Sequence, residues 1–417
     1  MKSKYDVVIV GGGPGGTVSA LALLQVGIRP LILEKQPFPR FHIGESLSSE
    51  AGESLRRLGL STQMQAAGYL RKHGVKVFGA QGKNAFWVPI QIRDATHQLQ
   101  PSTSWHVRRS HFDQLLLETA LERGAGYVAG EALTPIVKDG RVRGVRLRTP
   151  AGTTESVAAD VVIDASGQAT WLANRSDLTS GKERGAYNRQ VAIFSHVQGA
   201  QYEPDKAATK TLIFYRQKHH WAWFIPLDDE VVSLGVVVPS RYFQASQLTP
   251  QAFLERELQT LNPELTWRVQ EITYMDHVRT ASNYSYHIRH FTGQGFLCVG
   301  DAHRFIDPIF SFGLNFAISE GCFAAKAIAD ILGGTREPKS NPFAEYQDLA
   351  ERGQNIVQDL VDCFWNFPMA FLLFVRYRYQ EDMIDMFAGR VYDDGIEASV
   401  GRQALRRMLA TPHSDKG

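Results

Sequence analysis

The hydrophobic pattern near the N-terminus predicts a strand, a helix and a second strand in close succession. Tyr5–Val10 is an uninterrupted run rich in β-branched residues, which is typical of a strand buried on both faces of a parallel sheet. Apolar residues at helical spacing follow over Thr17–Val26. A short apolar run, Pro30–Leu33, then ends at Glu34. Together these segments predict a βαβ unit.

Later patterns predict two more buried strands, a hairpin and several helices. Ala159–Ala165 and Gly295–Val299 are short, continuous apolar runs. Asp139-Gly140 separates two strand-like segments and is a strong hairpin signal. The apolar stretch Phe364–Val375 predicts a buried helix, with a lid or a membrane-surface role as the alternative. The full set of predicted helices covers residues 17–26, 48–68, 109–123, 248–262, 313–332 and, except near 393–395, residues 342–417.

The order of these elements predicts an α/β fold in which one domain interrupts another. The segments typical of nucleotide-binding folds are separated by strand-rich, aromatic stretches. We expect a Rossmann-like nucleotide-binding domain interleaved with a β-sheet substrate domain, followed by a C-terminal helical extension. The expected boundaries are 1–75, 105–180 and 285–335 for the first domain, 76–104 and 181–284 for the β-rich domain, and 336–417 for the helical region.

Composition excludes several classes of protein. The 417 residues include 45 Lys and Arg against 43 Asp and Glu, a net charge of +2, which argues against a nucleic-acid-binding surface. The cysteines, Cys298, Cys322 and Cys363, are too few for a disulfide framework, so we expect a reducing cytoplasm. The N-terminus runs into the first strand without a secretory signal, and Phe364–Val375 is too short to span a membrane.

A glycine motif follows the first predicted strand. Gly11, Gly13 and Gly16 form GxGxxG, in which the glycines permit a tight turn, close approach of a pyrophosphate, and close packing of helix on strand. The helix N-terminus offers free N–H groups to phosphate. Glu34, 18 residues later at the end of the second strand, can bind ribose hydroxyls. The motif and its context predict a dinucleotide site.

Two later strands favour FAD over NAD as the dinucleotide. Asp164 lies just before Ser166-Gly167, and Gly300-Asp301 follows the last buried strand, ahead of the helix that begins near Gly313. A carboxylate there can bond a ribityl chain, and the helix N-terminus can face a flavin carbonyl. From residue 5 to about 330, these motifs, with Arg109 in VRRSHFD, resemble the FAD-dependent monooxygenase superfamily related to p-hydroxybenzoate hydroxylase.

Three further motifs narrow the resemblance. Phe41–Leu47 reads FHIGESL, and Phe305–Gly313 reads FIDPIFSFG. In His220–Pro226, HWAWFIP, Trp221 and Trp223 are two residues apart on a predicted strand, so their rings face one side. Together these motifs resemble the flavin-dependent halogenases, which carry G-W-x-W-x-I-P and F-x-x-P-x-x-S-x-G. The residues that match are Trp221, Trp223, Ile225, Pro226, Phe305, Pro308, Ser311 and Gly313.

The resemblance implies a halogenation that depends on FADH2, O2 and chloride or bromide. In this family a C4a-hydroperoxyflavin reacts with halide, and the hypohalous acid is held or activated by a lysine beside an electron-rich arene. Trp221 and Trp223 would keep the arene from the peroxide, although ordinary sheet packing is an alternative. Backbone N–H groups at Ser311, Phe312 and Gly313 would hold the halide. The implied catalytic residues are Lys72, Trp221, Trp223 and Ser311.

The lysine itself has two candidates. Arg71–Gly79 contains Lys72 and Lys76. The family pattern, a lysine followed by small residues and a strand with Phe, fits Lys72 with Phe78 in register, and Lys76 is the second candidate. Either side chain could instead be a solvated lysine at a strand end.

The same resemblance implies a set of cofactor-binding residues. They come from the glycine motif, the segment after the second strand, the VRRSHFD helix and the two later strand ends. They are Gly11, Gly13, Pro14, Gly16, Glu34, Lys35, Arg40, Ile43, Gly44, Glu45, Ser46, Arg109, Asp164, Gly167, Gly300, Asp301, Pro308, Gly313, Leu314 and Asn315.

Three positions depart from the family pattern. Phe310 stands where tryptophan halogenases have Glu, which implies a phenol- or pyrrole-type member instead. Phe312 replaces a usual Ser or Thr, and His220 replaces the leading glycine of the tryptophan motif. Because of Phe312 and His220, the sequence leaves open whether the protein uses halide. No metal-ligand spacing joins the histidines, which we expect to be polar-network or surface residues: His106, His219, His220 and His303.

The expected substrate is a phenol or pyrrole, free or tethered to an acyl or peptidyl carrier protein. No second GxGxxG is present, so we expect a separate NAD(P)H-dependent reductase to supply reduced flavin. Two alternatives stay open. One is a halide-independent FAD monooxygenase or prenyl-reductase-like enzyme, and the other is a non-catalytic flavin-binding homologue, to which Phe312 and His220 point.

Overall fold

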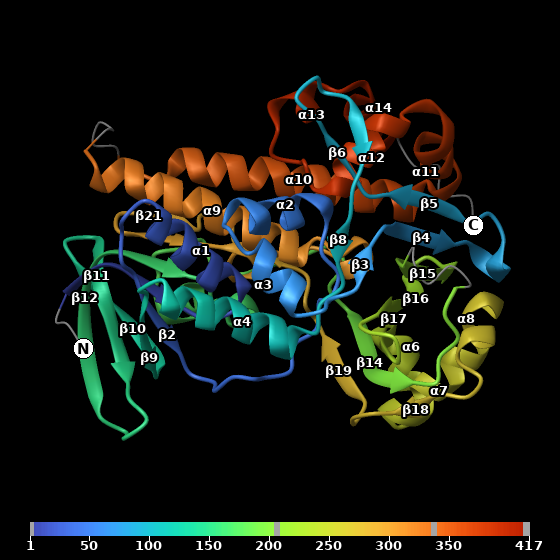
Figure 1. Ribbon diagram of the computed structural model, residues 1–417, viewed down its shortest axis with the longest axis horizontal. Coiled ribbons are helices and arrows are strands. Elements are labelled where there is room, and N and C mark those ends of the chain that lie inside the picture. Colours follow the sequence, from blue (N-terminus) through green and yellow to red (C-terminus); the bar gives the residue numbers. More distant parts are fainter. Residues whose placement is uncertain (1–3, 204–208, 335–339, 412–417) are drawn as a thin grey trace.

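The computed structural model describes residues 4–203, 209–334 and 340–411 (Figure 1). The expectation about a signal segment therefore falls partly on residues 1–3, outside the described ranges. Within them, helices and strands mix along the whole chain, and the predicted α/β fold class is confirmed.

The first sheet joins strands from three separate parts of the chain. Its order is β10-β11-β12-β1-β2-β9, with β22 paired to both β12 and β21. Strands β1, β2, β12 and β22 run parallel, so their C-terminal ends lie along one edge, where open α/β sheets bind ligands. The strands are β1 (Lys4–Val10), β2 (Leu31–Glu34), β9 (Gly126–Ala129), β10 (Glu131–Lys138), β11 (Arg141–Arg148), β12 (Thr154–Asp164), β21 (Thr292–Gly293) and β22 (Phe296–Cys298).

Helices α1 (Pro14–Gln25), α4 (Arg109–Glu122) and α9 (Gly313–Leu332) pack on this sheet and share one hydrophobic core with it. The contact between α1 and α9 is close because both contribute small residues: a Cβ on Gly321 would lie 3.1 Å from the Gly15 carbonyl oxygen. This contact fixes two helix N-termini relative to one another.

The prediction of one continuous helix over residues 48–68 is wrong. The structure has two helices, α2 (Ser49–Arg57) and α3 (Ser61–Ala66), separated by a turn at Gly59. Gly59 has φ +71°, a left-handed conformation that ends a helix. The hairpin at Asp139-Gly140 joins β10 and β11 as predicted, and both residues have positive φ.

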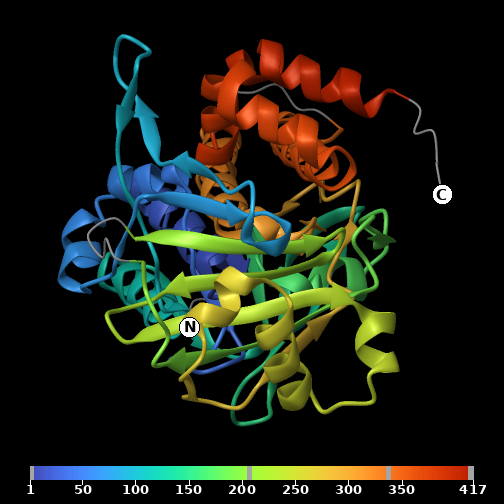
Figure 2. The ribbon, with the colours of Figure 1, turned by 90° about the vertical axis from the view of Figure 1, so that its right-hand side faces the viewer.

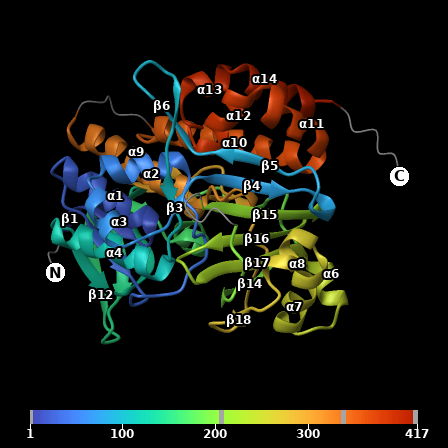
Figure 3. The ribbon, with the colours of Figure 1, turned by 45° about the vertical axis from the view of Figure 1, so that its right-hand side comes forward.

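The second large sheet follows the path β18-β14-β17-β16-β15-β4-β5, with β19 beside β14. Its side chains alternate between two cores. Helices α6, α7 and α8 cover one face, and the C-terminal helices lie toward the other (Figures 2 and 3). The elements are β4 (Gly74–Phe78), β5 (Phe86–Pro89), β14 (Gln190–Gln198), β15 (Lys210–Gln217), β16 (His220–Pro226), β17 (Val231–Pro239), β18 (Thr273–Tyr274), β19 (Arg279–Ser282), α6 (Ser240–Ala245), α7 (Pro250–Thr260) and α8 (Pro263–Arg268).

Smaller elements connect the two sheets. Two strands, β3 (Arg71–Lys72) and β8 (Ser104–Trp105), pair antiparallel, and Ser46 forms an isolated bridge with His106 just beyond β8. The remaining strands and the short helix after the Gly167 turn are β6 (Gln91–Arg93), β7 (Leu99–Pro101), β13 (Glu183–Arg184), β20 (Tyr286–His287), β23 (Arg304–Phe305) and α5 (Trp171–Arg175). The domain boundaries given above stay a prediction.

The C-terminal region is helical, but Phe364–Val375 is not the single buried helix that its composition predicts. The chain breaks at Phe367-Pro368, where proline cannot continue the preceding helix, and Met369 beyond the break is 64% exposed. The helices are α10 (Ala344–Asn366), α11 (Pro368–Leu373), a π-helical turn (Phe374–Arg378), α12 (Gln380–Ala388), α13 (Asp394–Ala398) and α14 (Val400–Leu409).

Within the described ranges, no single helix is long and apolar enough to cross a membrane. The helix α10 and the segment Pro368–Arg378 meet the length and composition criteria only as a pair, and they are bent by 115° at the break.

Gly235 tests the packing of the second sheet. A Cβ there would lie 2.4 Å from the Trp223 ring, its direct cross-strand neighbour. Because such overpacking costs about 1–3 kcal/mol, Gly235→Ala should lower the free energy of unfolding by that amount in a denaturant titration. The double variant Gly235→Ala/Trp223→Phe should recover part of the loss. An unchanged stability in the single variant would contradict this packing.

Candidate active site

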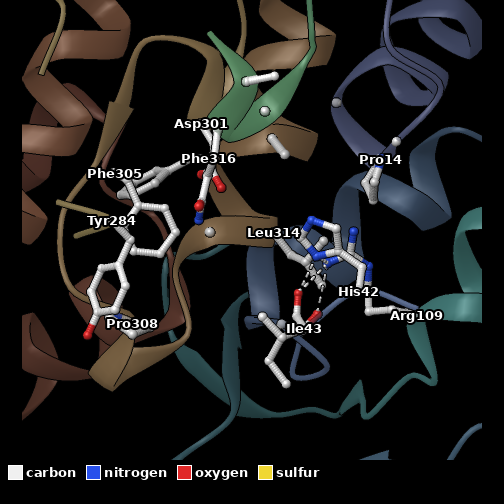
Figure 4. Close-up of a pocket in the computed structure, with 18 of the residues that line it drawn as sticks. Pro14, His42, Ile43, Arg109, Tyr284, Asp301, Phe305, Pro308, Leu314 and Phe316 are labelled. Atoms are coloured by element: carbon white, nitrogen blue, oxygen red, sulfur yellow. Dashed lines mark hydrogen bonds between the residues drawn. The ribbon is translucent and has the colours of Figure 1, made fainter. Parts of the chain in front are cut away.

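One cavity of about 640 Å³ extends from the C-terminal edge of the first sheet to the inner face of the second. Figure 4 shows Pro14, Arg109 and Leu314 on one side of this cavity and Tyr284 and Phe305 on the other. Twenty of the predicted site residues line it: Gly11, Gly13, Pro14, Glu34, Lys35, Arg40, Ile43, Gly44, Glu45, Ser46, Arg109, Gly167, Trp221, Trp223, Asp301, Pro308, Ser311, Phe312, Gly313 and Leu314.

The glycine motif forms one end of the cavity. Gly11 has φ +109°, which only glycine adopts without strain, and Gly13 caps α1 with no side-chain hydrogen bond. The first-turn N–H groups of α1 therefore have no side-chain partner at the cavity wall. A Cβ on Gly16 would lie 2.0 Å from the Gly11 carbonyl oxygen, so this glycine is needed for helix–strand packing and does not line the cavity.

Glu34 and Arg109 are held by fixed hydrogen bonds beside that end. The Glu34 carboxylate accepts from the backbone N–H groups of Gly12 and Gln36, both at 2.8 Å. Arg109 makes a bidentate pair with the buried Asp113, at 2.6 and 3.0 Å, and donates to the Ile43 carbonyl at 2.8 Å (Figure 4). Asp113, four residues after Arg109 on α4, is an anchoring residue that the motif comparison missed.

The start of α9 forms the middle of the cavity. No side chain caps this helix, and Ser311, just before it, is in the left-handed conformation with φ +60°. Asp301 lies in the same wall, and burial raises the pKa of its carboxyl to about 7. The two uncapped helices α1 and α9 thus present N-termini to one cavity.

These features fit FAD. The start of α1 can hold a pyrophosphate, Glu34 can hold the ribose hydroxyls, and Asp301 with the start of α9 can hold the ribityl chain and an electron-rich flavin carbonyl. The cavity wall leaves room for the cofactor at two glycines. A Cβ on Gly13 would meet only the Arg40 guanidinium, at 3.6 Å, and a Cβ on Gly313 would meet no described atom within 4 Å.

Trp221 and Trp223 form the wall beyond this middle section. Both rings lie on the cavity face of β16, as their spacing predicts, with centroids 5.9 Å apart. The Trp223 indole donates to Ser233 at 3.2 Å. The buried Trp221 indole N–H has no acceptor within the described residues, so it is free to bond a ligand.

The two departures from the tryptophan and serine motifs differ in position. His220 faces away from the cavity and packs edge-on against Tyr242, with ring centroids 4.8 Å apart. Phe312 does line the cavity, packed against Phe316 at a centroid distance of 6.0 Å. Of the two, only Phe312 can affect the space near the start of α9.

Lys72 is buried, at 3% exposure, so it is not a solvated strand-end lysine. Its ammonium donates to the Leu47 carbonyl at 3.0 Å, and burial lowers its pKa to about 7. Lys72 does not itself line the cavity, whereas Ser46, next to Leu47 in the chain, does. Lys76 is half-buried and paired with Glu203 at 2.6 Å.

Three side chains near Lys72, those of Ser46, Thr211 and His106, are joined by hydrogen bonds at the cavity wall. Thr211 contacts Ser46 at 2.8 Å and His106 at 3.0 Å through its hydroxyl. Both hydroxyl residues line the cavity, and His106, two residues past Lys72's cross-strand partner Ser104, is fully buried. Burial keeps the pKa of His106 well below its usual value. Motif comparison missed Thr211 because it comes from a strand without any motif.

Four predicted cofactor residues, Gly16 among them, do not line the cavity but support it. Asp164 accepts from the backbone N–H groups of Ser166 and Leu172 and so holds the loop after β12. The N–H of Gly300 donates to Glu320 at 2.7 Å, and Asn315 accepts from the Ser48 hydroxyl at 2.7 Å.

Besides Thr211, the polar cavity residues outside the predicted set include Tyr284, Asp307 and Arg304. The Tyr284 hydroxyl is buried and has no partner within the described residues. Asp307 is buried beside it, and burial raises its pKa to about 7. Arg304 donates to Asn355 on α10 at 2.7 Å. Tyr284 follows β19 outside every motif, and only the position of Asp307 inside FIDPIFSFG could have indicated it.

Within the described residues, no group of three or more His, Cys, Asp or Glu side chains could hold a metal. The fold and the cavity thus define a flavoprotein in which the flavin site opens into a tryptophan-walled chamber.

Comparison with known proteins defines the class further. Residues 4–357 match the model of the FAD binding domain family. The 1H-pyrrole-2-carbonyl-(peptidyl-carrier protein) brominase of Pseudoalteromonas luteoviolacea is 37% identical over 395 residues, which cover 94% of this chain and 93% of the relative. The corresponding chlorinase of Pseudomonas fluorescens is 28% identical over 432 residues, 99% and 94% of the two chains.

The solved structure of the flavin-dependent brominase Bmp2 superposes with a TM-score of 0.90 at 35% identity, covering 97% of this chain and 98% of that one. The chain belongs to the FAD binding domain family and, within it, to the flavin-dependent halogenases. It is therefore an enzyme that uses FAD and halide. Of the three alternatives from the sequence, the halogenase is the one that these relatives support.

Gly13 and Gly16 should differ in what their substitution changes. Gly16→Ala should lower the thermal stability of the FAD-free protein, by about 1–3 kcal/mol, because its Cβ would overlap the Gly11 carbonyl. Gly13→Ala should leave that stability unchanged and weaken FAD binding in a fluorescence titration. Equal losses of stability in both variants would contradict these separate roles.

Lys72 should make stability depend on pH. Its pKa of about 7 in the folded chain lies below its ordinary 10.5, so the unfolded chain binds the extra proton between these values. Wild-type stability should therefore gain about 1.4 kcal/mol per pH unit from this group between pH 7 and 10.5. Lys72→Met should be more stable than wild type at pH 7, with the gap closing toward pH 10.5. The control is Lys76→Met, at the half-buried lysine paired with Glu203, and it should not reproduce this gap.

Proposed function

We propose that this enzyme halogenates a pyrrole-2-carbonyl group tethered to a peptidyl carrier protein, and that hypohalous acid reaches the pyrrole through Lys72. Support comes from the two relatives named for this reaction and from one structural observation. A single cavity joins two uncapped helix N-termini to a tryptophan-walled chamber, and the buried Lys72 lies just behind its wall.

Reduced FAD, when bound, supplies with O2 the oxidising power that turns a halide into an electrophile. The protein's own contribution begins with separation. Trp221 and Trp223 line the cavity from β16, and β17 fixes Trp223 through Ser233. Two rigid indoles there would keep an arene from the flavin and leave a passage wide enough for a small oxidant.

The halide would bind at the start of α9. Backbone N–H groups and the positive end of a helix dipole attract an anion, and the residues just before the helix, Ser311 and Phe312, line the cavity. A halide needs no side-chain hydroxyl when backbone donors are present, so Phe312 is compatible with this role. The unpaired Trp221 indole N–H is a further donor in the same cavity.

Lys72 would hold the hypohalous acid. At its pKa of about 7, the ammonium exists partly as the neutral amine near neutral pH, so it can donate to the oxidant or accept from it. Within the described residues only one of its N–H groups is used, by the Leu47 carbonyl, so another could bond the oxidant once the side chain reaches the cavity. The substitution balances: the pyrrole carbon gains the halogen and loses a proton, and the hydroxyl of the hypohalous acid takes that proton and leaves as water.

The chamber fits an aromatic acyl group. Its walls are mainly apolar and include Phe194, Ile213 and Phe305. Tyr284 adds one buried hydroxyl without a partner among the residues that the structure describes, which suits the carbonyl of a pyrrole-2-carbonyl thioester. Phe310, where tryptophan halogenases carry Glu, adds no charge of its own to the loop next to this chamber.

Tyr284→Phe tests the role of that hydroxyl. The variant removes an unsatisfied buried donor, so the substrate-free protein should be as stable as wild type or slightly more stable. The KM for the tethered pyrrole should rise about two- to tenfold, which corresponds to one lost hydrogen bond. A KM equal to that of wild type would show that the hydroxyl does not contact the substrate.

Lys72→Ala tests the central step. With photochemically reduced FAD, O2 and bromide, wild type should add a bromine isotope doublet to a pyrrole-2-carbonyl carrier protein in mass spectrometry. Lys72→Ala should give no brominated product and should still bind FAD, because Lys72 does not line the flavin end of the cavity. Lys76→Ala is the matched control and should keep activity, since Lys76 is paired with Glu203 and does not line the cavity.

Halide-independent hydroxylation of the same substrate would contradict the proposal. Turnover that runs on NADPH without added reductase would contradict the further proposal that a separate flavin reductase supplies reduced FAD. Parallel reactions in chloride and bromide decide between the two halides, for which the relatives offer one example each.

A further inference from the structure

A stripe of apolar side chains is exposed on the segment after the break in the C-terminal helices. Met369, Leu373 and Tyr377 are 64%, 54% and 72% exposed. They are spaced four residues apart, so they lie on one side of the helical segment that joins α11 to its π-helical turn. Exposed apolar groups gathered in this way mark an interaction site more often than isolated ones do. We refer to these three residues as the 369–377 stripe.

The opposite side of the same segment is fixed to the wall of the active site. Phe371 is fully buried, and its ring stacks on Phe310 at a centroid distance of 6.0 Å. Phe310 lies between Ile309 and Ser311, which both line the cavity. The stripe is therefore separated from the loop at the start of α9 by a single helix thickness, roughly 10 Å.

Two arginines extend the stripe with positive charge. Arg376 and Arg378 are exposed, and neither forms an ion pair with any residue that the structure describes. Arg376 donates to the Ala85 carbonyl beside β5, which ties the π-helical turn to the second sheet. A π-helical turn in the middle of a helical segment is itself uncommon and is often found at functional sites.

We propose that the 369–377 stripe, with Arg376 and Arg378, is the docking surface for the carrier protein that presents the substrate. This inference rests on the proposed function. A carrier-tethered acyl group is attached through a phosphodiester on a serine, so the partner brings an obligatory anion next to the tether. Arginine is the side chain best suited to bind phosphate oxygens, and the apolar stripe can pack against the carrier helix beside that serine.

Other occupants fit the surface less well. In a twofold contact between two copies of this chain the same patch would face itself, bringing the unpaired arginines of both copies together. A membrane surface would need a longer amphipathic face, because three apolar side chains and two cations bury little. The α10 half of the bent helix pair is also packed inside the protein, with Ile356, Val357 and Leu360 fully or almost fully buried.

Reversing the charge of Arg376 and Arg378 tests carrier docking independently of the chemical step. In Arg376→Glu/Arg378→Glu, the KM for pyrrole-2-carbonyl carrier protein should rise about tenfold while kcat and FAD affinity stay close to wild type. The matched control is Arg143→Glu/Arg146→Glu, which makes the same change of charge at two exposed arginines of β11, on the far side of the molecule from α11 in Figure 1. That control should leave the KM unchanged.

A calorimetric titration of the loaded carrier protein into FAD-bound enzyme measures docking without turnover. Binding that weakens about tenfold in Arg376→Glu/Arg378→Glu alone supports the surface, even if wild type fails to halogenate the pyrrole and the proposed function is wrong. Equal binding and KM in both double variants would overturn it. Arginine-dependent co-sedimentation with phosphatidylglycerol vesicles, without any effect on the carrier, would also overturn it in favour of a membrane.

Discussion

The close packing of α1 against α9 is the constraint on which the site depends. Small residues on both helices let their backbones approach, and each helix begins at the carboxyl edge of the first sheet without a side-chain cap. Two sets of unsatisfied N–H groups and two positive dipole ends therefore face one space. Negatively charged and electron-rich groups are favoured there, so the same pair of helices could hold a pyrophosphate, a flavin carbonyl and a halide.

The second sheet adapts that general flavin site to halogenation. Its inner face sets the indoles of Trp221 and Trp223 and the Thr211 hydroxyl in the cavity wall. The segment from Glu45 to Ser48 connects this sheet to the rest of the site. Glu45 pairs with His196, Ser46 bonds Thr211, the Leu47 carbonyl holds Lys72, and Ser48 bonds Asn315 on α9. Four consecutive residues thus tie both ends of the cavity to the lysine. A shift of this segment would alter the position of Lys72 and of α9 together, which couples flavin binding to the proposed oxidant relay.

Much of the fold and of the cofactor site could be predicted from the sequence, and the parts that could not be predicted have physical reasons. The helix over Gly313–Leu332 and the strand–glycine–helix unit were predictable because buried parallel strands and long helices leave strong periodic signals. The break at Gly59 was missed because a single glycine inside a helical pattern carries little weight against its neighbours. Asp113, Thr211 and Tyr284 belong to the site only through tertiary contacts. The exposure of Met369 was likewise hidden, since apolar composition does not tell a buried face from a docking surface.

We propose that one cavity holds FAD across both helix N-termini and a halide at the start of α9. Anomalous diffraction from crystals of the FAD-bound enzyme soaked in bromide would locate both ligands. We expect the pyrophosphate at the start of α1, the flavin ring at the start of α9, and a bromide peak within hydrogen-bond reach of the backbone N–H groups of Ser311–Gly313. FAD bound in this way, with no bromide peak near those residues and the Phe312 ring filling the space, would contradict it.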